Sequence, residues 1–136
     1  MIGLVIVSHG EMAEGAIDAV RMIVGDQEQM VGIKLEEGDA VEQLESRIRE
    51  AVEDVDGGDG VLVLVDLFGA TPLNVSANVA AERDDLDVIT GFNLPMLLEI
   101  AMERTTSSVA ELVEIGEGAG AEGIKVLSKV LEEASS

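Results

Sequence analysis

Four strand-length apolar runs restrict the possible folds of this chain more than any other feature. They cover residues 2–8, Met30–Leu35, Val61–Val65 and Leu86–Thr90. The runs are rich in β-branched residues and mostly apolar, which is typical of strands that are buried on both faces of a parallel sheet. Because the third run is the most uniformly apolar, we expect it near the centre of the sheet.

The segments that follow the runs have the spacing of amphipathic helices. Residues 11–24 and 40–55 each place apolar residues on one helical face. Asp39 is expected to cap the second of these helices, with Glu42 completing a pair that resembles a capping box. Helices are also expected after the third and fourth runs, so strands and helices alternate along the chain.

Beyond residue 104, two further amphipathic stretches predict helices. They cover residues 107–115 and 121–134. Three glycines separate the two stretches and predict a flexible turn, namely Gly116, Gly118 and Gly120. The end of the chain is therefore expected to be helical.

The length and organisation of the chain predict one domain. There is no low-complexity linker and no internal repeat, and 136 residues suit one hydrophobic core. Parallel strands joined by right-handed helical crossovers commonly adopt the order 2-1-3-4. We therefore expect residues 1–136 to form a single α/β domain, with an open, mainly parallel sheet in that order, helices on both faces and a helical C-terminal portion.

The charge of the chain makes some partners unfavourable. Its formal net charge of -20 at pH 7 repels nucleic acid and anionic lipid, so a neutral or basic protein surface is a better candidate partner. No apolar run is long enough to cross a membrane, and direct membrane insertion is not expected. The first residues lack the features of a signal peptide, and there is no cysteine. We expect a soluble, cytoplasmic protein without disulfides.

The only histidine and one aspartate follow the two strands that the order 2-1-3-4 places side by side at its centre. His9 follows the first strand and Asp66 the third. Ligands of such sheets bind outside the carboxyl ends of the strands where the order reverses. A neutral imidazole can act as a nucleophile through one nitrogen while a carboxylate binds the N–H of the other. The pair therefore predicts a reactive histidine held in one tautomer by Asp66.

The surroundings of this pair favour a bound anion. Helices that begin after Gly10 and at Pro72 direct backbone N–H groups and positive dipole ends toward the same crevice. The hydroxyls of Ser8 and Thr71 could add hydrogen bonds. We therefore expect His9 to carry a phosphoryl group.

Three other kinds of site fit the sequence less well. A metal site would need more nitrogen or sulfur ligands than one histidine offers. A serine hydrolase would need a Gly-x-Ser-x-Gly elbow and a distant histidine, whereas Ser8 and His9 are adjacent. No glycine-rich nucleotide loop follows a strand, and no cofactor is expected.

Three ordered blocks of the sequence resemble the IIA domains of the mannose/fructose/sorbose family of the phosphoenolpyruvate-dependent sugar phosphotransferase system. The blocks are residues 5–10 (VIVSHG), 63–74 (VLVDLFGATPLN) and 91–99 (GFNLPMLLE). The resemblance covers nearly the whole chain. It implies that His9 accepts a phosphoryl group from the phosphocarrier HPr and passes it to a IIB domain, as a phosphotransferase component in sugar uptake.

The resemblance also implies residue roles and an assembly. Asp66 matches the aspartate that hydrogen-bonds the active histidine, and Thr71 matches a hydroxyl residue lining the site. Family members form homodimers, in some cases by exchanging a C-terminal strand, whereas residues 124–133 of this chain predict a helix. The candidate site residues are the catalytic pair His9 and Asp66 and, lining the phosphoryl site, Ser8, Gly10, Phe68, Gly69 and Thr71.

Other functions stay open on the sequence alone. The chain could be a regulatory module in which phosphorylation of His9 controls binding to a transcription factor or kinase. It could also be the phosphotransfer subunit of a dihydroxyacetone kinase, although residues 68–72 fit the sugar-type pattern better, or a structural domain that is never phosphorylated. Phe68 suits either a partner-docking surface or the core.

Overall fold

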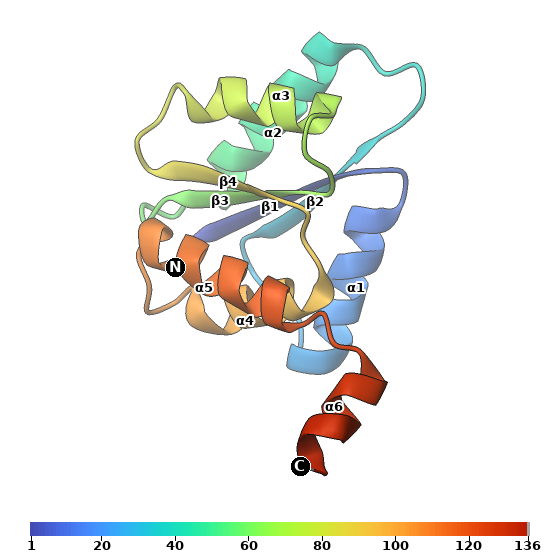
Figure 1. The fold of residues 1–136 in the computed structure, drawn as a ribbon. Helices are drawn as coiled ribbons and strands as arrows, with labels where there is room; N and C mark the ends of the chain where they lie inside the picture. The colour runs from blue at the N-terminus through green and yellow to red at the C-terminus, as the bar shows by residue number, and fades with distance from the viewer. Residues whose placement is uncertain (136) are drawn as a thin grey trace.

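The computed structural model describes residues 1–135. Its strands are β1 (Gly3–His9), β2 (Met30–Leu35), β3 (Val61–Val65) and β4 (Leu86–Thr90). Its helices are α1 (Met12–Val24), α2 (Val41–Val55), α3 (Thr71–Ala80), α4 (Leu94–Glu103), α5 (Val109–Glu122) and α6 (Leu127–Ala134). None of the helices in residues 1–135 is long and apolar enough to span a membrane. Figure 1 shows the predicted alternation of strands and helices.

The four strands form one parallel sheet in the order β2-β1-β3-β4, which confirms the predicted order. Val7 of β1 lies opposite Ile33 of β2 on one side and Val65 of β3 on the other. Because all four strands run in the same direction, their carboxyl ends lie at one edge of the sheet. The order of the strands reverses at β1 and β3, as expected for a ligand crevice.

Side chains of the central strands alternate between two apolar layers. Val5 and Val7 of β1 lie in the layer formed with α2 and α3. Leu4 and Ile6 lie in the opposite layer, with α1, α4 and α5. All five residues of β3 are fully buried, which accounts for its uniformly apolar sequence. Helices therefore cover both faces of the sheet, as Figure 1 shows.

The prediction that Asp39 caps α2 is wrong. Ala40 is the N-cap residue of α2, and no side chain of residues 1–135 caps this helix end. The Asp39 carboxylate instead accepts a hydrogen bond of 2.8 Å from the backbone N–H of Glu36. An aspartate that bonds a neighbouring backbone group favours a turn over a helix cap. Asp39 therefore fixes the shape of the β2–α2 loop.

The prediction of a flexible turn at the three late glycines is also wrong. Helix α5 runs without a break from Val109 to Glu122. A Cβ atom at Gly116 would lie 2.6 Å from Cδ1 of Ile100, and one at Gly120 would lie 2.8 Å from Cε of Met96. The glycines therefore let α5 pack closely on α4, and this packing outweighs the low helix propensity of glycine.

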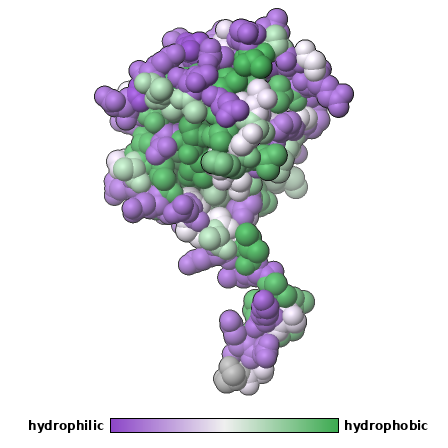
Figure 2. Space-filling model, turned by 45° about the horizontal axis from the view of Figure 1, so that its top comes forward, coloured by the Kyte–Doolittle hydropathy of each residue, from purple (hydrophilic) through white to green (hydrophobic). Residues whose placement is uncertain are grey.

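The last helix, α6, projects from the body of the molecule (Figure 1) and has no buried residue. The expected helix near the end of the chain is confirmed, with a start at Leu127. Figure 2 shows apolar surface on this projecting segment. Leu127 and Leu131 leave 71% and 59% of their surface exposed. Helix α6 therefore contributes no side chain to the core of this chain.

Candidate functional site

The parallel register brings His9 and Asp66 together at the carboxyl edge of the sheet. His9 is the last residue of β1, and Asp66 follows Val65, the last residue of β3. The backbone N–H of Asp66 donates to the carbonyl oxygen of Val7 at 3.2 Å, so the pairing of β1 and β3 continues to this position. Two residues that are 57 positions apart in sequence thus become neighbours through strand pairing alone.

One carboxylate oxygen of Asp66 binds His9 twice. Oδ2 lies 2.9 Å from Nδ1 of the imidazole and accepts a second hydrogen bond of 2.9 Å from the backbone N–H of His9. A carboxylate can only accept, so Nδ1 carries the proton in this pair and the neutral ring presents Nε2 as its free nucleophile. The His9 side chain is 50% exposed and that of Asp66 only 9%. The pair is thus an accessible nucleophile on a buried support.

The other carboxylate oxygen of Asp66 is an unusual feature of the site. Among residues 1–135, Oδ1 is buried and has no hydrogen-bond partner. A buried carboxylate oxygen without a donor costs free energy, and such groups often occur where function requires them. A positive charge on the His9 ring would offset this cost. Asp66 therefore supplies a negative charge behind the ring, which would stabilise positive charge that develops on it when Nε2 bonds an electrophile.

The chain turns into α1 through Gly10, which has a φ of +55°. This left-handed conformation suits glycine, and the N–H of Gly10 donates to the carbonyl oxygen of Leu35 at 3.0 Å. The Ser8 side chain is fully buried, and its Oγ accepts a hydrogen bond of 2.7 Å from the N–H of Ala13. Ser8 therefore holds the start of α1 rather than facing the crevice beside His9.

The loop between β3 and α3 lies open to solvent. Phe68 is 78% exposed, which places it at the surface rather than in the core. Gly69 has a φ of +82° and allows the chain to turn toward α3. Helix α3 begins at Thr71 and has a proline in its first turn, as expected from Pro72. Within the described part of the chain, the Thr71 hydroxyl has no hydrogen-bond partner and remains free to bind a ligand.

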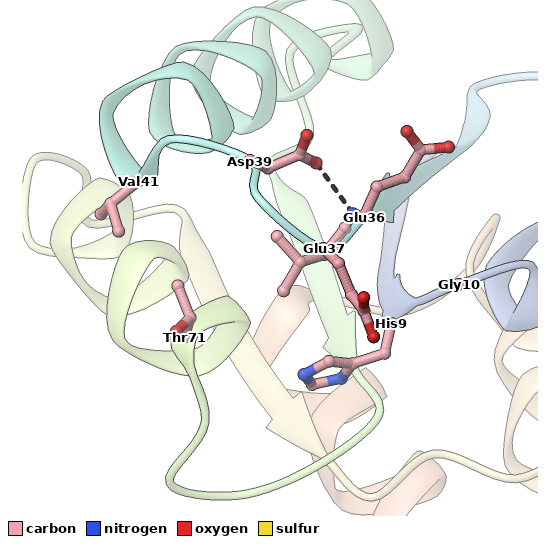
Figure 3. Close-up of a pocket in the computed structure, with 8 residues that line it drawn as sticks. His9, Gly10, Glu36, Glu37, Asp39, Val41 and Thr71 are labelled. Carbon is pink, nitrogen blue, oxygen red and sulfur yellow. Dashed lines mark hydrogen bonds between the residues drawn. The ribbon is translucent and has the colours of Figure 1, made fainter.

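A pocket of about 540 Å³ opens beside His9. Of the predicted site residues, His9, Gly10 and Thr71 line it, whereas Ser8, Phe68, Gly69 and Asp66 do not. Its other wall is the β2–α2 loop, shown in Figure 3. That wall comprises Leu35, Glu36, Glu37, Asp39 and Val41. The sequence reasoning missed this wall, although the order 2-1-3-4 places the end of β2 next to the end of β1.

The site offers no obvious place for a metal ion. Within residues 1–135, no three or more histidine, aspartate or glutamate side chains form a group that could hold one. What the geometry does provide is one nucleophilic nitrogen, a buried carboxylate behind it and a free hydroxyl from the next loop. These groups suit transfer of an anionic group to and from His9.

Comparison with known proteins agrees with this chemistry. A family described as "PTS system fructose IIA component" matches residues 3–116, a span that includes His9, Asp66 and Thr71. The chain belongs to this IIA family. The family assignment confirms the resemblance seen in the sequence and establishes a component of the sugar phosphotransferase system (PTS).

Individual relatives support the same assignment. The mannose-specific EIIAB component from Escherichia coli (strain K12) is 35% identical over 136 residues, covering 98% of this chain and 42% of that relative. The chain thus spans less than half the length of that relative. The fructose-specific EIIA component from Bacillus subtilis (strain 168) is 30% identical, covering 97% of this chain and 90% of the relative. A crystal structure of an EIIA component from Streptococcus agalactiae, 35% identical, superposes with a TM-score of 0.87, covering 95% of this chain and 99% of that one.

Proposed function

We propose that this IIA protein carries a phosphoryl group on Nε2 of His9, taking it from phosphorylated HPr and passing it to a IIB domain in the cytoplasm. The observation that carries the proposal is the hydrogen bond of 2.9 Å between Nδ1 of His9 and Oδ2 of Asp66. It leaves Nε2 as the free nucleophile on a half-exposed ring. Membership in the IIA family supports the same role.

The proposed phosphoryl transfer from the donor histidine to His9 needs no cofactor. The Nε2 lone pair of His9 attacks phosphorus as the P–N bond of the donor phosphohistidine breaks, and the donor imidazole leaves with that electron pair. The proton on Nδ1 stays in its hydrogen bond to Asp66, whose charge stabilises the cationic phosphorylated ring. The Thr71 hydroxyl, which lines the same pocket, can donate to a phosphoryl oxygen. The reverse sequence delivers the group to the next acceptor.

The direct test is reconstitution of the phosphorylation. Incubation with phosphoenolpyruvate, enzyme I and HPr should add one acid-labile phosphoryl group, measured by intact mass. Omission of HPr should prevent the labelling. Failure to label this chain under conditions that label a IIA protein of known activity would refute the proposal.

We also propose that the protein forms a homodimer through α6. An isolated eight-residue helix is not stable in water, so the exposed apolar face of α6 needs a covering surface. Lys125 and Lys129 beside this face form no ion pair within residues 1–135, in a chain of net charge -20. The acidic body of a second copy therefore offers a complementary surface.

Scattering mass in solution tests the dimer. The wild-type chain should have twice the mass of one chain at tens of micromolar protein, on the order of ordinary assay conditions. Leu131→Lys on α6 should shift the mass toward that of a monomer, whereas Met22→Lys, at another exposed apolar position, should not. A monomeric wild-type protein, or a dimer that ignores Leu131→Lys, would contradict assembly through α6.

A further inference from the structure

The pocket beside His9 has a negatively charged wall. The β2–α2 loop contributes Glu36, Glu37 and Asp39 to the pocket lining, and Figure 3 shows the Glu37 carboxylate turned toward His9 and the carboxylates of Glu36 and Asp39 turned away from it. The apolar side chains of Leu35 and Val41 lie among the same lining residues. The pocket therefore combines an apolar part, a negative part and the His9 imidazole.

Two of the three carboxylates already have partners, and the third does not. Glu36 lies 3.0 Å from the ammonium of Lys34. Asp39 accepts from the N–H of Glu36 and lies 3.8 Å from the guanidinium of Arg47. Glu37 is exposed and has no hydrogen bond or ion pair in the part of the chain that the structure describes. The uncompensated negative charge of the pocket therefore lies mainly on Glu37.

This charge opposes the group that His9 is proposed to carry. A phosphoryl group brings a charge of about -1.5 to -2 near neutral pH, and the Glu37 carboxylate, which lies on the His9 side of the loop, repels it. A small anionic phosphoryl donor meets this repulsion without compensation. A donor that brings a cationic side chain into the cavity places positive charge between the Glu37 carboxylate and the phosphoryl group.

We propose that Glu37 is a specificity determinant that restricts His9 to protein donors with a lysine or arginine beside their phosphoryl group. The inference rests on the proposed phosphoryl-carrier function and extends it to donor selection. The methylene stem of such a side chain fits along Leu35 and Val41, while its charged head reaches the Glu37 carboxylate. The acidic wall thus attracts the correct donor and disfavours small phosphorylated molecules.

The test compares two phosphoryl donors on two variants. Phosphoramidate serves as the small donor and phosphorylated HPr as the protein donor, with labelling of His9 followed by intact mass. Glu37→Gln should speed labelling by phosphoramidate about three- to ten-fold and lower kcat/KM for phosphorylated HPr by a similar factor. Glu50→Gln is the matched control, because Glu50 is an exposed helix residue outside the pocket. It should leave both rates unchanged.

The opposite signs of the two effects make the proposal falsifiable. Glu37→Lys should enlarge both changes, and added salt should shrink them, because exposed charges are screened. If Glu37→Gln alters both donors in parallel, or neither, Glu37 does not select the donor. If neither donor labels the wild-type protein, the carrier function itself is wrong, which is a different result. Circular dichroism shows whether each variant is folded.

Discussion

The two edges of the sheet use charged groups in opposite ways. At the amino edge, the buried guanidinium of Arg104 donates to the carbonyl oxygens of Ile2, Glu28 and Gln29 and to the side chain of Gln27. At the carboxyl edge, one oxygen of Asp66 holds the half-exposed His9. Within residues 1–135, each edge keeps one buried polar atom without a partner, Nε of Arg104 and Oδ1 of Asp66. The amino edge ties chain segments together, whereas the carboxyl edge leaves reactive groups available.

Because of this difference, substitutions at the amino edge should affect stability, and substitutions at the carboxyl edge should affect chemistry. Arg104 is 1% exposed, and burial lowers the pKa of its guanidinium. A buried cation of this kind joins the starts of β1 and β2 to the end of α4. His9 is half-exposed at the opposite edge, and within residues 1–135 its side chain bonds only Asp66. Loss of function without loss of fold should therefore be confined to the carboxyl edge.

The largest expected effect is at His9. His9→Ala should abolish phosphorylation, because the chain contains no other histidine. The fold should persist, since the imidazole is half-exposed and packs in neither apolar layer. Intact mass after incubation with phosphorylated HPr measures the loss, and circular dichroism checks the fold. Acid-labile phosphate on His9→Ala would mean that another residue is the carrier.

The second-largest expected effect is a fall in the phosphoryl transfer rate when Asp66 is changed. Asp66→Asn keeps the size of the side chain but removes the charge that stabilises the phosphorylated ring, and its amide can hold the wrong tautomer. The transfer rate should fall by about 10²–10⁴-fold, with little change in HPr docking. Rapid-quench measurements at saturating phosphorylated HPr separate the two. Asp84→Asn, on the exposed α3–β4 loop, is the matched control. Equal rates for wild type and Asp66→Asn would reduce Asp66 to a structural residue.

The sequence predicted the fold and the contact between His9 and Asp66 better than the rest of the pocket. Four apolar runs sufficed for the order β2-β1-β3-β4, and that order placed His9 beside Asp66. Ser8 was misplaced, because strand alternation buries its hydroxyl under α1. Glu37 was missed, because only the ends of β1 and β3 were considered. The sequence predicted a turn within α5, because the low helix propensity of glycine carries no information about the packing of α5 on α4.

In contrast to His9 and Asp66, substitutions at the amino edge should lower stability without affecting phosphoryl transfer. Arg104→Met fills similar space but removes the guanidinium donors to the carbonyl oxygens of Ile2, Glu28 and Gln29, of which Gln29 still accepts from the N–H of Leu4. The free energy of unfolding should fall by about 2–4 kcal/mol. Arg47→Met, at a half-exposed position, should change it by less than about 0.5 kcal/mol. Urea unfolding gives both values. If Arg104→Met remained as stable as the wild type, or lost phosphorylation while folded, the two edges would not differ in the way described.

The smallest expected effect is a pH-dependent change in the free energy of unfolding when the pairing of Asp56 with Arg83, at the amino edge, is removed. The Arg83 guanidinium, and next the Gly58 N–H, hold the pKa of the Asp56 carboxyl below its ordinary value. Because the folded pKa lies below that of the unfolded chain, about 3.9, the pairing stabilises the fold above that pH. This stabilisation is lost as the pH falls through the lower folded pKa.

Asp56→Asn should therefore lower the free energy of unfolding by about 1 kcal/mol at pH 7 and by less at pH 3, which lies below the unfolded pKa of about 3.9. Urea unfolding at the two pH values measures the change, with Asp54→Asn, whose side chain is exposed, as the control. If the free energy of unfolding differs between wild type and Asp56→Asn by the same amount at pH 7 and pH 3, the effect comes from the hydrogen bonds of Asp56 with Gly58 and Gly60 and not from its charge. Labelling of His9 at pH 7 should match the wild type, because Asp56 lies at the opposite edge of the sheet from His9.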